Sequence, residues 1–530
     1  MKSNNLKARR SNKYFLRRSF IQDRSILYIL TIIVALIALF PLVNLISEGV
    51  NGIKNGSVNL GIDGADQIKG TFILFVFSST LGAIIGTVNG WLHSNCRFTG
   101  RKLLRIAQLI PLATPAYLLS ATLIDLGSIN SIRIYGLPWG VLIMAFTTYP
   151  YVYLLSTESF SISGKRQLEA CRSMGIGPWK SFFRIALPMA IPAIGAGIAL
   201  MGMEIINELG AVQLLNIPTI SAGIVENWMS ENNPSGAIGL ALIALLIVIG
   251  LITFERILRR RSRRWNEGIA GGEAPEWELK GIRAILSQFI GIIAPTFTLG
   301  IPIFWCLINS DQLIKSLDVD LFSITIRSIL LGLVTSLITL SSAILLAISK
   351  RWAKSRFINL ITFLSGIGYA IPGVVMAMAL LSFSNSALRF PPFLLLIWGY
   401  SVRFLAVAKG GIDSSFERMH PNLDEAAVNL GSRWPRVLKK IHLPLLKGPM
   451  LVGSLLVFVD TLKELPLTFV LRPFDFDTLS VRIFQYAGDE RMAEAIIPAM
   501  LILIIGLIAS LALIPSLGEI HSNKSKNLSN

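Results

Sequence analysis

The sequence predicts an all-α integral membrane protein, with about 12 transmembrane helices arranged as two pseudo-symmetric halves of six. This prediction depends on an apolar composition, on apolar stretches of membrane-spanning length and on an internal repeat. Of the 530 residues, 53% are hydrophobic and 15% are charged, and the mean hydropathy is +0.62. A soluble chain of this size cannot bury so much apolar surface, so we expect a bilayer to cover it.

Twelve apolar stretches approach the roughly 20 residues that cross about 30 Å of hydrocarbon. In the first half they lie at 26–46, 70–90, 103–124, 138–157, 190–212 and 236–254. In the second half they lie at 285–308, 326–348, 358–382, 393–409, 446–470 and 494–515. Pro111, Pro115 and the Pro372-Gly373 pair should kink the third and ninth stretches, either to line a gate or as part of ordinary packing.

Charged residues set the orientation of these stretches, because Lys and Arg collect on the cytoplasmic side of a membrane protein. Residues 1–24 carry eight basic residues and one acidic residue, and residues 255–264 carry six and one, whereas the loop 213–235 is acidic. We therefore expect a cytoplasmic basic tail (1–24), a first half (25–256), a cytoplasmic linker (257–283), a second half (284–515) and a cytoplasmic tail (516–530).

Several function classes are excluded by what the sequence lacks. The net charge of +18 does not indicate nucleic acid as a partner, because no basic run with interleaved aromatic residues remains outside the spans. Cys96, Cys171 and Cys306 lie far apart and form no metal-binding pattern, so we expect reduced packing residues. No GxxxxGK[ST] phosphate loop, HExxH motif or histidine cluster is present, so we expect no bound cofactor, no metal site and no catalytic residue in this chain.

One segment occurs twice at a constant offset of 256 residues (425 − 169). It reads EACRSMGIGPWKSFFRIALP at 169–188 and EAAVNLGSRWPRVLKKIHLP at 425–444. Leu423, Ala426 and Ala427 recur at helical spacing, and a glycine then permits a left-handed turn. We expect a helix–turn–helix elbow that protrudes from the membrane and continues rigidly into the fifth span of each half. An amphipathic loop on the headgroups is the alternative, and two copies at one topological position make it less favoured.

This repeat closely resembles the cytoplasmic loop of permease subunits from binding-protein-dependent ABC importers, with Cys171 replacing the second alanine. The stretch from Val459 to Ala495 is similar to the fused, two-half permeases of ferric-iron importers. The resemblance implies a type I ABC importer permease fold in the bacterial inner membrane. It also implies two copies of a separate ABC ATPase, which use ATP and Mg, and a periplasmic iron-binding protein. It assigns ATPase coupling to Glu169, Ala170, Gly175, Pro188, Glu425, Ala426, Ala427, Gly431 and Pro444.

Charged residues late in the fifth span of each half are candidates for the translocation path. The repeat offset places Asp460 over Glu204 and Glu464 over Glu208, with Lys463 between the two later acids. At 1.5 Å per residue the first-half acids lie roughly 21–27 Å from the cytoplasmic edge. Because ionised groups are costly there, we expect them to face a partner or a wet cavity, and four converging carboxylates would suit a hard cation. Lys463 neutralising an acid, and Glu464 capping a helix end, are the structural alternatives.

The sequence therefore predicts a non-enzymatic transport subunit, most consistent with import of ferric iron. A permease for another small solute, such as thiamine or a polyamine, stays open within the same class. A secondary transporter that works without an ATPase would also show twelve spans and an internal repeat. A scaffold without transport activity is the least favoured alternative, because buried carboxylates are costly without a task.

Overall fold

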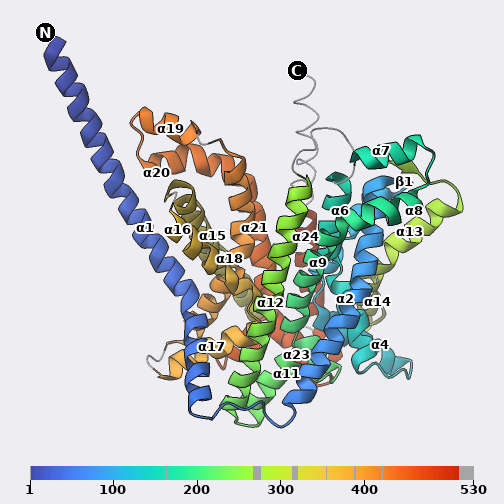
Figure 1. Cartoon of the computed structure of the whole chain (residues 1–530). Helices are drawn as coiled ribbons and strands as arrows, with labels where there is room; N and C mark the ends of the chain where they lie inside the picture. The colour runs from blue at the N-terminus through green and yellow to red at the C-terminus, as the bar shows by residue number, and fades with distance from the viewer. Residues whose placement is uncertain are drawn as a thin grey trace.

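The computed structural model of the chain describes residues 2–162, 165–266, 276–312, 320–353, 355–386, 390–420 and 422–512. The predicted C-terminal tail (516–530) and part of the linker (267–275) lie outside these residues. Within them the chain is almost entirely helical, and its two short strands, β1 (Cys96–Arg97) and β2 (Trp277–Glu278), pair in parallel. Figure 1 shows the arrangement.

The helices follow the two predicted halves. The first half contains α1 (Lys2–Lys54), α2 (Gly64–Asn95), α3 (Arg101–Ala107), α4 (Ala116–Ile129), α5 (Leu137–Thr148), α6 (Pro150–Ile162), α7 (Lys165–Ser173), α8 (Pro178–Ser181), α9 (Leu187–Asn207), α10 (Gly210–Leu214), α11 (Ile220–Val225) and α12 (Pro234–Asn266). The second contains α13 (Ile282–Pro295), α14 (Ile301–Ile308), α15 (Leu321–Ala353), α16 (Arg356–Leu364), α17 (Gly373–Ser386), α18 (Pro392–Arg418), α19 (Asn422–Asn429), α20 (Trp434–Val437), α21 (Leu443–Lys463), α22 (Pro466–Leu471), α23 (Leu479–Gly488) and α24 (Met492–Ala512).

Short turns of other helical types connect or extend these helices. Three are 3-10 turns: η1 (Ile110–Ala113), η5 (Ser310–Gln312) and η6 (Ser365–Ala370). Four are π turns: η2 (Phe182–Ala186), η3 (Glu226–Ser230), η4 (Thr296–Gly300) and η7 (Leu438–His442). The helix α12 continues past residue 256, where we expected the linker to begin, because the basic run 255–264 remains helical.

The apolar helices agree with a multi-pass membrane protein. Among the described residues, eight are long and apolar enough to cross a bilayer, and the number rises to at most 11 if each of three bent pairs is one span. The last predicted span corresponds to the shorter apolar helix Met492–Ile508. The all-α membrane fold is therefore confirmed, whereas the count of 12 stays a prediction.

The predicted kinks are confirmed as sharp breaks at the third span of each half. The axes of the helical segments Arg101–Ala113 and Ala116–Ile129 differ by 89°, and those of Arg356–Ala370 and Gly373–Ser384 by 110°. The residues before the prolines, Thr114 and Ile371, are extended, with ψ of 114° and 123°. Proline disfavours the helical conformation of its predecessor and supplies no N–H, which ends the helix at these points.

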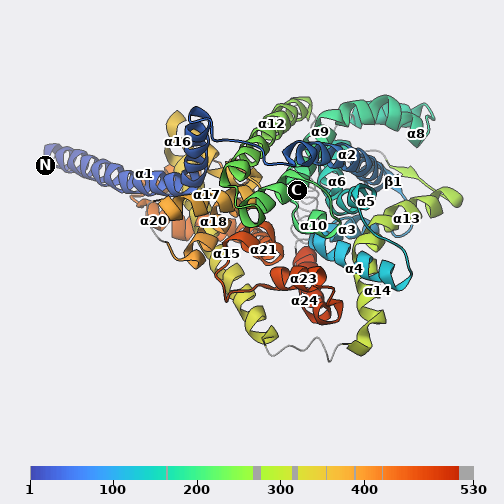
Figure 2. The same ribbon diagram turned by 90° about the horizontal axis from the view of Figure 1, so that it is seen from below.

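The first span of each half packs against the other half. In Figure 2, α1 lies beside α16 and α17, and it also packs against α15, whereas α13 and α14 lie beside α3 and α4. The Trp398 indole N–H donates to the Ile37 carbonyl at 3.0 Å, and the Trp305 indole N–H donates to Asp125 at 2.6 Å. The two halves are thus interlocked by exchanged helices.

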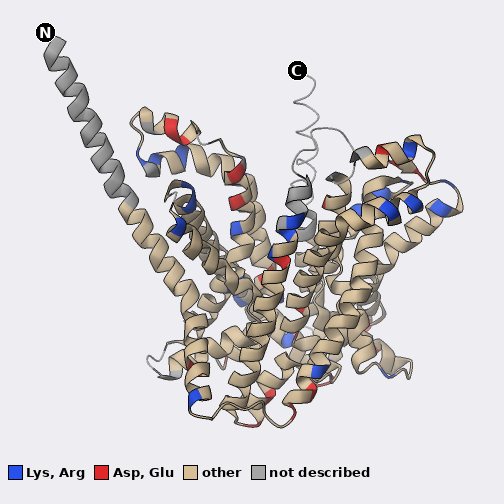
Figure 3. Cartoon of the chain, viewed as in Figure 1, with Lys and Arg blue, Asp and Glu red and all other residues tan. Residues whose placement is uncertain are grey.

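The two predicted elbows lie at the same end of the molecule. Figure 1 shows α7 and α8 on one side and α19 and α20 on the other, at the end where α1 begins. Lys and Arg gather at this end in Figure 3, around both elbows and the end of α12. Because basic residues mark the cytoplasmic side, the charge distribution agrees with the expected orientation.

Candidate functional site

The first elbow, residues 165–186, turns at Gly175. The helix α7 ends there in a Schellman motif, in which Gly175 N–H donates to Arg172 O at 3.0 Å and Ile176 N–H donates to Cys171 O at 2.9 Å. Gly175 has φ = +71°, the left-handed conformation that this motif needs and that glycine adopts without cost from a Cβ. A second helical piece then begins with Pro178.

The second elbow, residues 422–442, has the same geometry. Gly431 has φ = +78°, and Ser432 N–H donates to Ala427 O at 3.0 Å. The following helical piece runs through the π turn η7, which lies 256 residues after the π turn η2 of the first elbow (438 − 182). The predicted helix–turn–helix shape is therefore confirmed in both copies.

Each elbow continues into a long rod. Pro178–Asn207 forms one helical segment of 30 residues and Pro435–Lys463 one of 29 residues. Pro188 and Pro444 lie in the first turn of α9 and α21, where a missing N–H is tolerated. At 1.5 Å per residue each rod is about 45 Å long, which is enough to cross the bilayer.

The elbows present polar and apolar side chains to solvent. Glu169, Ala170, Glu425 and Ala426 are exposed, whereas Ala427 is buried in an apolar cluster that the elbow shares with the membrane helices. Just before the turn glycines, Met174 is 68% exposed and Leu430 is 87% exposed, at the same repeat offset. Large apolar side chains exposed in matching positions on two copies are typical of surfaces that a partner covers.

The second elbow is anchored by an ion-pair network. Asp424 accepts from Arg351 Nε at 2.5 Å, and its other oxygen lies 2.7 Å from His442 Nε2. Arg351 also donates to backbone carbonyls of Phe416, Met419 and His420. Burial opposes ionisation of Asp424, but the hydrogen bonds and charges of its two partners outweigh it and hold the pKa of this carboxyl below its ordinary value of 3.8.

The first elbow is anchored by apolar packing instead. The repeat offset replaces Asp424, His442 and Arg351 by Leu168, Ala186 and Asn95, which cannot form an ion pair. Leu168 and Ala186 belong to a buried cluster together with the side chains of Trp91, Phe160 and Phe182. The two elbows therefore share a backbone shape but differ in what fixes them to the membrane domain.

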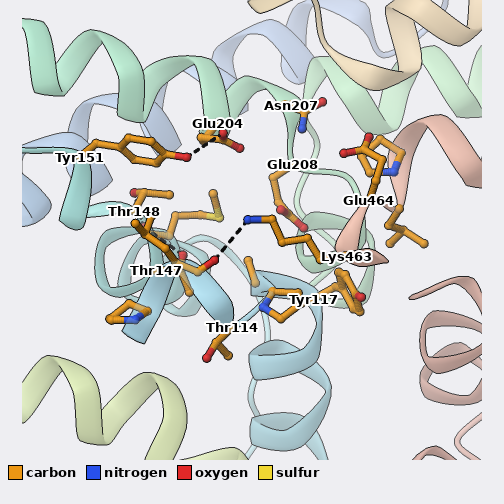
Figure 4. Close-up of a pocket in the computed structure, with 17 residues that line it drawn as sticks. Thr114, Tyr117, Thr147, Thr148, Tyr151, Glu204, Asn207, Glu208, Lys463 and Glu464 are labelled. Carbon is orange, nitrogen blue, oxygen red and sulfur yellow. Dashed lines mark hydrogen bonds between the residues drawn. The ribbon is translucent and has the colours of Figure 1, made fainter. Parts of the chain in front are cut away.

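A cavity lies between the halves at the far ends of the two rods. It offers about 100 Å³ to water-sized molecules, which is room for several waters. Its polar lining combines first-half and second-half residues (Figure 4): Thr114, Tyr117, Thr147, Thr148, Tyr151, Glu204, Asn207, Glu208, Lys463 and Glu464. Four of the five predicted translocation residues line this one space, and the fifth, Asp460, forms an ion pair with Lys463 at 2.8 Å.

The glutamates after the two rods cap the next helices. Both rods end earlier than the predicted spans, at Asn207 and Lys463, so Glu208 and Glu464 lie beyond the helix rather than on its face. Glu208 accepts from Ala211 N–H at 2.8 Å, and Glu464 accepts from Leu467 N–H at 3.3 Å. The capping alternative for Glu464 is thus confirmed, and it holds in both halves.

The acids around this cavity have different partners. Glu204 accepts from both Tyr151 and Tyr369 at 2.9 Å, and Glu464 faces Arg403 Nε at 3.6 Å. Among the described residues, no group of three or more His, Cys, Asp or Glu side chains is placed to hold a metal ion. The role of the four carboxylates in a path for a hard cation therefore stays a prediction, and in this conformation each of Glu204, Glu208, Asp460 and Glu464 has a protein partner.

Two residues at the same repeat offset reach across the interface between the halves. Asn207 accepts from Gly373 N–H at 2.6 Å, at the start of the helix that follows the break in the ninth span. Lys463 donates to Leu112 O at 3.2 Å, in the turn that precedes the break in the third span. Each rod end is thus bonded to the broken span of the opposite half.

Sequence reasoning missed several residues of this cavity. Tyr117 is 3% exposed and its hydroxyl has no hydrogen-bond partner among the described residues, and the Thr114 hydroxyl is also unpartnered. In the sequence, a single tyrosine or threonine near an apolar stretch does not indicate that its side chain lines a cavity. Asn207, which also lines the cavity, did carry a sequence signal because it lies at the repeat offset of Lys463. Arg403, which faces Glu464 outside the lining, carried one as a charge within a predicted span.

Comparison with known families agrees with the paired elbows. The family described as "Binding-protein-dependent transport system inner membrane component" matches residues 72–264 and 340–520, one match in each half. The chain belongs to this family. It is therefore a membrane transport subunit rather than an enzyme, in a family whose members depend on a binding protein.

The relatives of this family member differ in the solute that their names state. The Fe(3+)-transport system permease protein FbpB 2 of Haemophilus influenzae is 26% identical over 81% of this chain and 86% of its own length. The sulfate transport system permease protein CysT of Escherichia coli is 30% identical over 27% of this chain and 56% of its own length. The molybdenum transport system permease protein ModB of Escherichia coli is 27% identical over 37% of this chain and 94% of its own length.

Proposed function

We propose that the chain supplies both halves of the transmembrane permease of an ATP-driven importer of ferric iron in the bacterial inner membrane, with both termini in the cytoplasm. Two copies of a separate ABC ATPase dock on the elbows, and a periplasmic iron-binding protein delivers the cargo. ATP and Mg belong to the ATPase, and this chain holds no cofactor of its own. The observation that carries the proposal is the pair of matching elbows at one end of the molecule.

The elbows act as the contact to the ATPase. Glu169 and Glu425 supply the polar contacts, and the exposed side chains of Met174 and Leu430 supply apolar ones. Gly175 and Gly431 set the turn, and Pro188 and Pro444 begin the membrane-embedded parts of the rods. Closure of the two ATPase copies moves the elbows, and the rods carry this movement to the cavity about 45 Å away.

The gate is the set of contacts at the far ends of the rods. In this conformation Asn207 and Lys463 bond each rod end to the opposite half, and Glu208 and Glu464 hold the following short helices. A passage between the halves requires that the two cross-interface bonds break. Because one bond is formed at the end of each rod, a symmetric stroke releases both.

Two observations favour ferric iron as the cargo. The relative named for Fe(3+) matches 81% of the chain, whereas the sulfate and molybdenum relatives each match less than half of it. The cavity region also carries an excess of acid, with Glu204, Glu208, Asp460 and Glu464 against the cations of Lys463 and Arg403. Excess negative charge in a site of low dielectric constant attracts cations and repels oxyanions such as sulfate.

Uptake by reconstituted vesicles tests this proposal. The chain is purified with its ATPase, placed in vesicles, and supplied with ferric iron on the binding protein, with sulfate, molybdate and thiamine as alternative solutes. We expect iron uptake that requires ATP hydrolysis. Uptake of a solute without ATP would indicate a secondary transporter. ATP-dependent uptake of sulfate, molybdate or thiamine instead of iron would refute iron as the solute but would agree with an ATP-driven importer.

A further inference from the structure

The linker between the halves folds back onto the first elbow. The strand β2 pairs in parallel with β1, which directly follows α2, and Leu279 N–H donates to Arg97 O at 2.9 Å. Arg101 Nη1 forms an ion pair with Glu276 Oε1 at 2.7 Å, which fixes the chain just before the strand. Residues 276–279, which we name the linker strap, are therefore held against the cytoplasmic end of the first half.

Trp277 connects the strap to the turn of the elbow. Its indole N–H donates to Ile176 O at 3.3 Å, and Ile176 is the residue that follows the turn glycine Gly175. Its ring lies 5.6 Å from that of Trp91, which packs in turn on Phe182 of the elbow at 5.4 Å. The strap thus contacts the elbow through a directional hydrogen bond and through the apolar cluster that anchors the elbow.

The second elbow has a different anchor. The residues at the strap's repeat offset, 20–23, lie within the helix α1 and form no strand. The network of Arg351, Asp424 and His442 holds the second elbow instead. The two elbows are consequently held by different contacts. Those of the first elbow include the linker strap, which belongs to the segment that joins the two halves.

We propose that Trp277 is a positioning residue for coupling, and that the linker strap sets the orientation of the first elbow toward the ATPase. The strap ends three residues before α13 begins, and α13 packs on the first half. Contacts with the first half therefore fix the position of the strap. Loss of the strap leaves the first elbow tied only by its apolar cluster. Movement of the ATPase then displaces the first elbow less than the second, and less iron is taken up for each ATP hydrolysed. This inference rests on the proposed function, since coupling presupposes an ATPase partner.

The experiment combines a distance measurement with a transport measurement. Spin labels are attached to cysteines introduced at Ser173 and Asn429, which are exposed and occupy the same repeat offset on the two elbows. The variants are Trp277→Ala and Trp277→Phe, the latter keeping the aromatic ring while removing the donor. Trp139→Phe is the matched control, because it changes a half-buried tryptophan of α5 that packs in an apolar cluster separate from that of the elbow.

We expect Trp277→Ala to broaden the distance distribution and to lower iron uptake per ATP hydrolysed. Loss of one hydrogen bond corresponds to a shift of about three- to tenfold in the population of a displaced elbow. Trp277→Phe should show a smaller shift in the same direction, and Trp139→Phe should match the wild type. Unchanged distances and an unchanged uptake ratio in Trp277→Ala would overturn the inference. If the wild-type chain shows no ATP-dependent uptake, the proposed function fails, and the distance distribution alone decides the role of the strap.

Discussion

Replacing Gly431 by valine should uncouple ATP hydrolysis from transport. Gly431 has φ = +78°, a conformation that costs a residue with a side chain roughly 1–2 kcal/mol and a β-branched residue more. Among the described residues outside its chain neighbours, no heavy atom lies within 4 Å of a Cβ placed there, so the penalty comes from the backbone alone. At 1.4 kcal/mol per factor of ten, the native turn loses about five- to thirtyfold in population relative to competing turns.

The assay measures iron uptake and ATP hydrolysis in the same vesicles. Gly431→Asn should stay close to the wild type, because asparagine adopts left-handed conformations more readily than other residues with side chains. Gly448→Ala is the matched control in α21, where the described chain leaves open space around the new methyl group and alanine favours the helix. Equal coupling ratios for Gly431→Val and the wild type would refute the role of the turn. An equal loss in Gly448→Ala would indicate general damage to the helix.

The remaining predictions concern the cavity and the second elbow. Glu464→Gln should reduce iron uptake while membrane insertion and ATPase binding persist, and unchanged uptake in vesicles would exclude a required carboxylate. Tyr117→Phe should leave the melting temperature unchanged, because its hydroxyl has no partner to lose among the described residues, but should lower uptake if that hydroxyl contacts the cargo. Asp424→Asn should weaken protection of residues 422–429 against hydrogen exchange, since each charge-assisted bond contributes about 1.5–3 kcal/mol. Because the pKa of Asp424 is lowered, its contribution should persist at neutral pH and disappear only as the pH falls below 3.8.

The exchange of the first spans predicts that the halves do not act as separate units. The helix α1 is bonded to the second half through Trp398, and α14 to the first half through Trp305. The helix α15, on which the second rod packs, also packs against α1 from the first half. Such interlocking favours a concerted opening of the cavity over independent motion of each half.

Elements with a local physical cause could be predicted from the sequence. The elbows follow from helical spacing and one left-handed glycine, and the breaks in the third and ninth spans follow from proline stereochemistry. The same features recur in both halves at the repeat offset, and this offset also makes Lys463 equivalent to Asn207. Length and hydropathy identified most of the spans. In the described chain the number of spans is eight, or up to 11 if each bent helix pair counts as one span.

What the sequence by itself determined is the pair of elbows, the rods that follow them and the acids near the rod ends, because backbone preference and apolar periodicity act between residues close in the chain. Only the tertiary structure decided which half receives each first span, that Asn207 and Lys463 bond across the interface, and that each acid has its own partner. It also decided that the linker strap lies on the first elbow. These features depend on contacts between residues far apart in the chain, and neither periodicity nor local propensity specifies which distant surfaces meet.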